Sequence, residues 1–577
     1  MTQKLAEKSP YSSKIWLKSY DEHIKPKLEF EIISLAEMMK DVVKEFPDSL
    51  CYDFQAEKVT FQEAEKYVIS FANFLIENGL KKGDRVAIML PNIPQYFVGL
   101  WGTFYAGCTS TGMNFLLQLP EIIYQLKDSG AVALLTLDSF YEEKVRTALE
   151  TGNTDVKLVI TTNVADALSI DETMKEQLMK IGKVPVGEVV PLDNVLSFTY
   201  KEILDKYSND KAPEVEIDPK NDIAFLQYTG GTTGPPKGAI LTHENILYNI
   251  KHTYNWFEPG ANRGYGVYIS GFPFFHLAGM SLNYGAVHSA AAQILIPDPR
   301  DTSYFSNKAK EYQDKINLMC NVPTLYLMLM GDRKFRKLNL REDCGFLSGA
   351  APFPSESIKE FEEIVGKEKV IECYGMTEAS PIVTFNPYLG PKKIGTVGVP
   401  VQNTEVKIVN VEDGKNEIPI GEAGEIVIKG PQIFKGYWKK PKETEHALRD
   451  GWFYSGDVGV MDEDGFITIV DRTKDMINVS GFKVFSVEVD DKMNKHPAIE
   501  LCASVGVPDK DRPGSEYVKL YVLLKEGFEH SDDTKAEILK FAQENLAKYK
   551  IPREIEIVKE MPLTTVGKVD KKVLRKS

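Results

Sequence analysis

Apolar and polar positions alternate in two different patterns along the chain. From residue 52 to residue 200, short apolar runs typical of buried strands alternate with amphipathic runs typical of helices. Arg85 to Leu90 and Ala131 to Thr136 are two of the strand-like runs, and Ile93 to Ala106 between them has helical spacing. The alternation resumes at Ile223 to Tyr228 and continues through Lys369 to Cys373. Strands alternating with helices predict an α/β fold built on a largely parallel sheet.

The pattern changes after about Lys393. Short apolar runs there are joined by turn sequences, among them Glu412-Asp413-Gly414 and Asp462-Glu463-Asp464-Gly465, which predicts hairpins in a small β-rich subdomain. The charged stretch Asp471-Arg472-Thr473-Lys474-Asp475 separates this subdomain from a compact α+β tail. We therefore predict a large N-terminal domain of residues 1–473, which includes the β-rich subdomain, and a small mobile C-terminal α+β domain of residues 474–577.

Length, composition and charge narrow the class of protein. The 577 residues are 43% hydrophobic and 26% charged, which is typical of a soluble globular protein with several structural units. With 69 basic against 83 acidic side chains, the formal charge of -14 disfavours nucleic acid and anionic lipid as broad partners. No stretch approaches the roughly 18 apolar residues of a membrane span, and the Lys-rich start lacks the apolar core of a signal peptide. We expect a cytoplasmic protein, with peripheral membrane contact left open.

The six cysteines are dispersed along the chain. None has the close Cys/His spacing of a structural zinc site, and there is no C-x-x-C pair. We expect reduced thiols, mostly in the core, at Cys51, Cys108, Cys320, Cys344, Cys373 and Cys502.

A loop rich in glycine and threonine follows the apolar strand at Ile223 to Tyr228. Its backbone N–H groups can approach an anion closely, its hydroxyls can donate to phosphate oxygens, and Lys237 adds an ammonium. A helix is expected to begin near Thr242, so that the loop lies between a strand and a helix. The loop is not the P-loop of NTPases, because Gly238 stands where that motif has Ser or Thr. The residues predicted to bind a polyphosphate are Thr229, Gly230, Gly231, Thr232, Thr233, Gly234 and Lys237.

This loop resembles the signature loop of the adenylate-forming superfamily, which comprises acyl-CoA synthetases, adenylation domains and luciferases. Its Gly-Gly start is similar to that of the bacterial and archaeal long-chain fatty acyl-CoA ligases. Further segments match the motifs of the family in the same order, and an ordered series is far more specific than one motif. The matches are Phe274-Phe275-His276, Gly349-Ala350-Ala351-Pro352, Tyr374-Gly375-Met376-Thr377-Glu378, Tyr454-Ser455-Gly456-Asp457, Asp471-Arg472, Ser480-Gly481, and Pro562-Leu563-Thr564 with Gly567-Lys568.

The resemblance implies a reaction in two steps that uses ATP, Mg²⁺ and coenzyme A. A carboxylic acid is first joined to the α-phosphate of ATP with release of pyrophosphate, and the thiol of coenzyme A then displaces AMP. Because the first step brings a carboxylate to a polyanion, cations and N–H donors must stabilise its transition state. By the resemblance, Lys568 bridges the two reacting groups, Glu378 binds Mg²⁺ and Thr377 donates to the α-phosphate. From the residues alone, a surface lysine and a helix-capping turn are the alternatives.

Other matched residues are implied to hold the nucleotide. Tyr374 could stack on adenine, and Asp457, expected in a turn flanked by glycine, could accept hydrogen bonds from the ribose hydroxyls. Arg472 would reinforce the ribose or the phosphate. The alternative for the two charged residues is a solvated pair in a turn. The resemblance also assigns to the nucleotide site Gly349, Ala350, Ala351 and Gly375.

The segment that ends at His276 is implied to border the acyl pocket. Amino-acid-activating relatives carry an Asp in this neighbourhood, and its absence here favours an apolar acid, in particular a medium- to long-chain fatty acid. His276 would lie between the acyl pocket and the thiol channel, unless it is an ordinary core histidine. Gly481 is implied to let the pantetheine arm pass, although a hairpin turn would also favour glycine there.

Lys568 and Gly481 belong to the same tail but serve successive steps at one acyl centre. The resemblance implies that the tail rotates about Lys474, two residues past Arg472, so that each face closes in turn. A lone lysine in a linker is otherwise an ordinary solvated charge.

We predict an ATP-dependent fatty acid–CoA ligase with fatty acid, ATP and coenzyme A as small-molecule partners, and the resemblance implies a homodimer. One alternative is an adenylating enzyme that passes its acyl group to a separate carrier protein or to oxygen. A second is a ligase for a short, hydroxylated or aromatic acid. A third is a nucleotide-binding regulatory protein without chemistry, against which the presence of both Lys568 and Glu378 argues.

Overall fold

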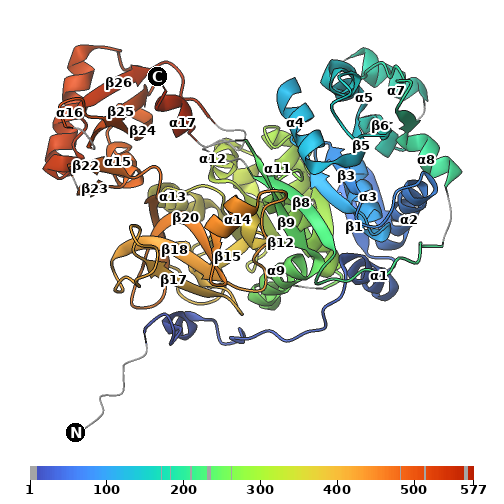
Figure 1. Cartoon of the computed structure of the whole chain (residues 1–577), viewed down its shortest axis with the longest axis horizontal. Coiled ribbons are helices and arrows are strands. Elements are labelled where there is room, and N and C mark those ends of the chain that lie inside the picture. The colour runs from blue at the N-terminus through green and yellow to red at the C-terminus, as the bar shows by residue number, and fades with distance from the viewer. Residues whose placement is uncertain are drawn as a thin grey trace, which may run out of the picture.

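The computed structural model describes residues 9–170, 172–181, 184–207, 211–229, 235–261, 263–480, 482–512, 515–563 and 569–576. Figure 1 shows a large body of sheets and helices, with a smaller C-terminal unit at its upper left. This arrangement, with mixed α/β architecture in the large part, confirms the predicted fold class. None of the described helices is long and apolar enough to cross a membrane.

A seven-stranded sheet leads into the phosphate loop at one edge. Its strands are β3 (Arg85–Met89), β4 (Thr109–Gly112), β5 (Ala131–Leu137), β6 (Leu158–Thr162), β7 (Leu196–Thr199), β8 (Ile223–Thr229) and β9 (Lys237–Thr242). Their order is β7-β6-β5-β3-β4-β8-β9, and every neighbouring pair is parallel except β8 and β9. The central strands are buried almost throughout, which explains their continuous apolar runs.

Helices of the N-terminal half pack around this sheet. The helices are α1 (Leu35–Glu45), α2 (Phe61–Glu77), α3 (Pro94–Tyr105), α4 (Leu119–Ser129), α5 (Asp138–Phe140), α6 (Arg146–Glu150), α7 (Glu172–Lys180) and α8 (Tyr200–Lys206). Capping boxes at Ser34 and Thr60 begin α1 and α2. Helix α3 is buried along its whole length, because it packs between α2 and strands β3 and β4.

A second sheet of nine strands leads into a second group of candidate site residues. Its strands are β1 (Leu50–Phe54), β2 (Glu57–Thr60), β10 (Val267–Ser270), β11 (Ala292–Leu295), β12 (Ile316–Asn321), β13 (Gly345–Ser348), β14 (Val370–Gly375), β15 (Ile382–Phe385) and β16 (Val399–Pro400). The order is β16-β15-β14-β13-β12-β10-β11-β1-β2, and the pairs from β14 to β1 are parallel. The parallel strands therefore end at one common edge.

Two helices pack against each other beside both sheets. Helix α9 (His243–Trp256) contacts β8 and β9, whereas α10 (Leu277–His288) contacts β10 and β11. Their apolar residues share one core with strands of both sheets. Three further helices pack on the nine-stranded sheet around a second core. They are α11 (Thr302–Glu311), α12 (Pro323–Gly331) and α13 (Ser355–Val365).

The predicted β-rich subdomain is present. It contains β17 (Glu405–Val409), β18 (Ala423–Lys429), β19 (Leu448–Arg449), β20 (Trp452–Met461) and β21 (Ile467–Arg472), with the short helix α14 (Pro441–Ala447). All of its strand pairs are antiparallel, in the order β17-β18-β20-β19 with β21 also on β20.

The C-terminal unit has an apolar core of its own. Its elements are the hairpin β22 (Ile477–Val479) and β23 (Phe482–Val484), the sheet β24 (Ile499–Pro508), β25 (Glu516–Leu524) and β26 (Glu554–Val558), and the helices α15 (Ser486–Met493), α16 (Asp532–Asn545) and α17 (Lys571–Leu574). The domain boundary after residue 473 stays a prediction. All six cysteines are free thiols and five of them are buried, as expected.

Candidate active site

The phosphate loop connects two antiparallel strands. Thr229 at the end of β8 pairs with Lys237 at the start of β9. A helix begins at the predicted point, since the Thr242 side chain caps α9, but β9 lies between the loop and that helix. The predicted helix start near Thr242 is therefore confirmed, and β9 is an additional strand that the sequence did not predict. Five of the predicted loop residues lie outside the described residues, namely Gly230, Gly231, Thr232, Thr233 and Gly234.

Strand β9 forms because its backbone is paired on both sides. On the side away from β8, the Ile240 N–H donates to the carbonyl of Gly436 at 3.0 Å, and the Trp438 N–H donates to the carbonyl of Gly238 at 2.8 Å. A segment some two hundred residues further along the chain thus completes the edge beside the phosphate loop.

Tyr437 of this segment joins Lys237 to Glu378. Lys237 Nζ lies 4.3 Å from the centre of the Tyr437 ring, and the Tyr437 hydroxyl donates to Glu378 Oε1 at 2.7 Å. Burial raises the pKa of the Glu378 carboxyl, while the Tyr437 hydrogen bond and the Lys237 charge oppose that rise. The three side chains place an ammonium and a carboxylate next to each other where the phosphate loop ends.

Thr377 and Glu378 lie in a short 3₁₀ turn, Thr377–Ala379, directly after β14. The buried Asn249 side chain of α9 fixes the far end of this turn, because its amide donates to the carbonyls of Ala379 at 3.4 Å and Ile382 at 3.0 Å. The alternative of a helix-capping turn is seen only in part, because Thr377 begins a helical turn but no side chain caps it. The same turn holds Glu378 against Tyr437, which a cap alone would not require.

On the same strand, Tyr374 contacts the residues predicted to bind the ribose. Its hydroxyl donates to Asp457 Oδ2 at 2.7 Å, and Arg472 Nε lies 3.3 Å from Asp457 Oδ1. Asp457 and Arg472 face each other directly across β20 and β21, so the expected turn at Asp457 is a strand instead. The Asp457 side chain is only 15% exposed, so Asp457 is not a solvated turn residue, whereas the Arg472 side chain is 43% exposed.

The loops after β13 and β14 approach each other closely. A Cβ at Gly349 would lie 2.6 Å from the sulfur of Cys373, and one at Gly375 would lie 2.1 Å from the Pro381 carbonyl oxygen, so both positions require glycine. Ala350 adopts φ of 66°, in the left-handed region that non-glycine residues rarely occupy. Since β13 and β14 are parallel neighbours, residues 349–351, including Ala351, lie beside the 374–378 segment, as the predicted site requires.

His276 caps the first turn of α10. Its ring nitrogen Nδ1 accepts the Ala278 N–H at 3.3 Å. The segment before it is held by the Gln227 side chain of β8, which donates to the Phe275 carbonyl at 2.9 Å, and by Asn92, which accepts the Phe274 N–H at 2.7 Å. A structural role for His276 is therefore present, and its predicted catalytic role stays a prediction.

Lys568 and Gly481 lie outside the described residues, so their predicted roles are not tested by the structure. The residues on either side of the Lys568 segment are joined: Leu563 and Val569 form an antiparallel bridge, and the Asp570 N–H donates to the Pro562 carbonyl at 2.8 Å.

Glu378 fits Mg²⁺ only with help from a substrate. Among the described residues, no group of three or more His, Cys, Asp or Glu side chains could hold a metal ion. One oxygen of Glu378 accepts the Tyr437 hydroxyl, which leaves the other for a cation, and Mg²⁺ commonly takes one carboxylate together with substrate phosphates and water. The donor set therefore fits Mg²⁺ that arrives with a nucleotide.

Sequence reasoning missed Tyr437 and two asparagines of α9, Asn245 and Asn249. Asn245 is buried and donates to the carbonyls of Pro431 at 2.7 Å and Ile433 at 3.1 Å, which ties the Tyr437 segment to the helix that also holds the Glu378 turn. The sequence features that could have pointed to these residues were weak. They were an aromatic pair after Gly436, and two amides in an otherwise apolar helical stripe.

Comparisons with known proteins agree on one family. The family described as "AMP-binding enzyme" matches residues 39–438, and "AMP-binding enzyme C-terminal domain" matches residues 488–568. A long-chain-fatty-acid–CoA ligase of Bacillus subtilis (strain 168) is 36% identical over 566 residues, which cover 97% of each chain. A ligase of the same description from Escherichia coli O6:H1 is 34% identical over 570 residues and covers 97% of this chain and 98% of the relative.

Solved structures with the same fold include ATP-bound MatB from Rhodopseudomonas palustris. It has a TM-score of 0.79 and 25% identity, and the match covers 94% of this chain and 99% of MatB. The structure of apo MatB from the same organism gives a TM-score of 0.70 at the same identity and coverage. Together with the ordered motifs and the geometry of the site, these matches show that the chain belongs to the AMP-binding, adenylate-forming enzymes.

Proposed function

We propose that this protein is an AMP-forming acyl-CoA synthetase that joins a fatty acid, of medium to long chain, to coenzyme A at the expense of ATP. The proposal rests on two groups of interacting polar side chains that meet at the end of β14. One group is Lys237, Tyr437 and Glu378, suited to phosphates, and the other is Tyr374, Asp457 and Arg472, suited to a ribose. The similarity to the long-chain-fatty-acid–CoA ligases of Bacillus subtilis and Escherichia coli supports the choice of acid.

The proposed ribose contact depends on the hydrogen bonds that the Asp457 carboxylate can still accept. A carboxylate offers about four lone-pair directions, and Tyr374 and Arg472 use one on each oxygen. One acceptor site per oxygen remains for the two ribose hydroxyls, and the two protein donors hold the carboxylate in place. The nucleotide is thereby oriented with its phosphates toward the Glu378 turn.

In the first half-reaction, a carboxylate oxygen of the acid forms a bond to the α-phosphorus while the bond to pyrophosphate breaks. Lys237 and, by the resemblance, Lys568 and Thr377 supply charge and donors to the phosphate oxygens. Mg²⁺ on Glu378 would neutralise part of the triphosphate charge when bound. In the second half-reaction, the thiolate of coenzyme A attacks the acyl carbon and AMP leaves.

The position of the β22–β23 hairpin supports a rotation between the two half-reactions. Lys483 of this hairpin forms an ion pair of 3.3 Å with Glu412, at a turn of the β-rich subdomain. The hairpin therefore contacts the subdomain in this orientation, whereas Gly481 is proposed to serve the acyl centre.

An apolar cavity between the two helices and the nine-stranded sheet suits the acyl chain. It is lined by α9, α10, and strands β10, β12, β13 and β15. Gly285 of α10 lines it, and a Cβ at this position would meet no atom within 4 Å. The cavity is small in this structure, so a long chain requires neighbouring side chains to move aside. We propose that the acyl chain enters here.

The test measures pyrophosphate release and AMP formation separately with acids from acetate to palmitate, and with ferulate as the aromatic competitor. Ferulate is included because a feruloyl-CoA synthase of Amycolatopsis sp is 30% identical over 519 residues, or 90% of this chain. We expect pyrophosphate with a fatty acid and ATP alone, and AMP only after coenzyme A is added. AMP formation with ferulate but with none of the fatty acids would contradict the proposed substrate class.

Two expectations complete the proposal. We expect the ATP-dependent step to require Mg²⁺, because the Glu378 carboxylate and a triphosphate are both negatively charged and a cation is needed to bind both. A homodimer follows from the resemblance and a cytoplasmic location from the sequence composition, and both stay predictions.

A further inference from the structure

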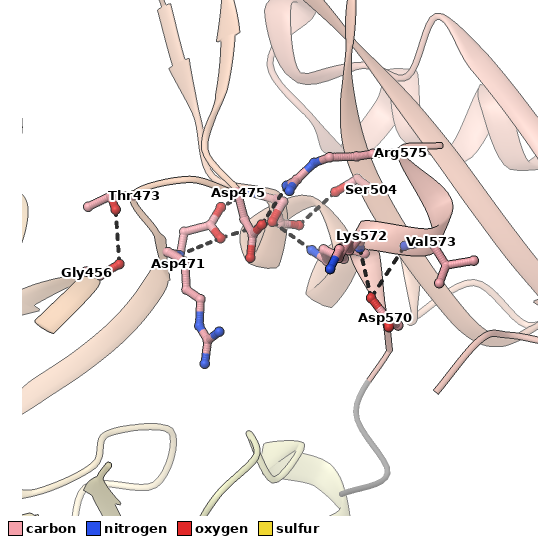
Figure 2. Close-up of polar contacts among 12 residues, drawn as sticks. Gly456, Asp471, Thr473, Asp475, Ser504, Asp570, Lys572, Val573 and Arg575 are labelled. Carbon is pink, nitrogen blue, oxygen red and sulfur yellow. Dashed lines mark hydrogen bonds and ion pairs between the residues drawn. The ribbon is translucent and has the colours of Figure 1, made fainter. Parts of the chain in front are cut away.

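A chain of buried polar contacts joins the end of β21 to the last helix of the protein, as Figure 2 shows. It starts at Asp471, whose side chain is buried next to the N-terminus of α15. Asp471 Oδ2 accepts the Ser486 N–H, and Asp471 Oδ1 accepts the Ser486 hydroxyl at 3.1 Å. Both carboxylate oxygens are thus used by one serine of the C-terminal unit.

The Ser486 hydroxyl also accepts a hydrogen bond from Lys571 of α17. Lys571 Nζ donates to Ser486 Oγ at 2.7 Å and to Asp490 Oδ2 at 2.7 Å. The side chains of Lys571 and Asp490 are only 15% and 13% exposed, so this pair is shielded from water. The other carboxylate oxygen of Asp490, Oδ1, accepts the Ser504 N–H at 2.5 Å. Lys571 lies three residues past Lys568, and the bridge between Leu563 and Val569 joins the residues on either side of the segment that contains Lys568.

This series of hydrogen bonds crosses the proposed rotation axis at Lys474. Asp471 pairs with Val458 across β20 and β21, so its backbone belongs to the β-rich sheet of the large domain. Thr473 is still tied to that sheet, because its N–H donates to the Gly456 carbonyl at 2.9 Å. The Thr473 hydroxyl donates to the same carbonyl at 3.2 Å (Figure 2). Ser486 and Lys571 follow Lys474 and belong to the C-terminal unit. A rotation about Lys474 must therefore separate Asp471 from Ser486.

A second contact of α17 lies on one side of the axis only. Arg575, one turn after Lys571, forms an ion pair of 2.6 Å with Asp475. Asp475 follows Lys474, so this pair can move with the C-terminal unit as a whole. It ties the same helix to the same linker without crossing the axis, which makes it a matched control.

We propose that Asp471, Ser486 and Lys571 form a hinge latch, which holds the C-terminal unit in its present orientation, with the β22–β23 hairpin at the β-rich subdomain, and must open before thioester formation. This inference rests on the proposed ligase reaction and on its rotation. The three are positioning residues, since none of them is placed on the nucleotide or the acyl group. Their contacts are formed in one orientation and lost in the other, so they favour one half-reaction only.

The test compares Ser486→Ala and Asp471→Asn with Arg575→Ala in the full-length protein. Ser486→Ala removes the hydroxyl that joins Asp471 to Lys571 and keeps the backbone bond, so the fold should persist. We expect pyrophosphate release to slow by about tenfold, while thioester formation from a supplied acyl-adenylate stays unchanged or becomes faster. Asp471→Asn should act in the same direction. Arg575→Ala should change both half-reactions by the same factor.

Hydrogen exchange gives a second readout that a purely structural role would not move. The Ser486 amide should exchange slowly with ATP present, and faster when coenzyme A is added together with a non-hydrolysable acyl-adenylate analogue. Equal losses in both half-reactions for Ser486→Ala, or exchange at Ser486 that does not respond to these ligands, would overturn the latch and leave the ligase intact. A wild-type protein that releases no pyrophosphate with any fatty acid would instead overturn the proposed function.

Discussion

Replacing Tyr437 by Phe tests whether the Glu378 carboxylate serves the ATP step. The substitution removes one hydroxyl and keeps the ring that lies against Lys237. The hydroxyl donates to a carboxylate at 2.7 Å, and a hydrogen bond to a charged group contributes roughly 1.5 to 3 kcal/mol. Because Glu378 is only partly buried, we expect the lower end of that range, which corresponds to about a tenfold loss in kcat/KM for ATP.

The sign of the pH effect follows from the same contact. Burial raises the pKa of Glu378, and the Tyr437 hydroxyl opposes the rise by stabilising the ionised form. Without the hydroxyl the pKa should rise further, so the acid limb of the pH profile should move to higher pH. The loss should then be largest at low pH and become smaller as Glu378 ionises.

The assay is pyrophosphate release at saturating fatty acid, over the pH range in which the protein stays folded, with Mg²⁺ titrated at each pH. Tyr20→Phe is the matched control, because the Tyr20 hydroxyl donates to a backbone carbonyl, that of Pro400, at 2.7 Å. An acid limb in Tyr437→Phe that coincides with the wild type, or that moves equally in Tyr20→Phe, would refute the role of this hydrogen bond.

Four further substitutions test the remaining assignments. Lys568→Ala should slow pyrophosphate release by about 10² to 10³ and largely spare thioester formation from a supplied acyl-adenylate, and equal losses would remove its role in the first step. Gly481→Leu should do the opposite, with adenylate accumulating, and normal acyl-CoA formation by the folded variant would leave the glycine only a turn. Lys474→Pro fixes φ near roughly −65° and should slow the second half-reaction about tenfold more than the first. Small and equal losses in both half-reactions would place the rotation axis elsewhere. Gly285→Leu should raise KM for palmitate far more than for a short acid, and an unchanged chain-length profile would exclude this cavity as the acyl site.

The sequence predicted local features well because they depend on neighbouring residues. Thr242 caps α9 at the predicted residue, and the parallel sheet follows from apolar runs that alternate with amphipathic ones. The turn expected at Asp457 was wrong, since Gly456 with its φ of 74° lies within a ten-residue strand that pairs with β21. A glycine that permits a turn does not require one when both flanking segments find strand partners.

The missed contacts depend on residues that are distant in sequence. Tyr437 and Glu378 are 59 residues apart, and β9 exists partly because residues 436–438 pair with it. No local pattern encodes which tyrosine reaches which carboxylate, because that choice is made by the packing of α9 and the β-rich subdomain. Such partners emerge only when the chain is folded.

The direct pairing of Asp457 with Arg472 across β20 and β21 has a thermodynamic consequence. Arg472 contacts the proposed ribose ligand and lies two residues before Lys474. With the axis at Lys474, a nucleotide that stabilises one pose of Arg472 also stabilises one orientation of the C-terminal unit. Linkage then requires the reverse: each orientation must set the affinity for the nucleotide by the same factor. The orientation that admits coenzyme A would thus differ from the first in its affinity for AMP, so nucleotide release and domain position would be two readouts of one equilibrium.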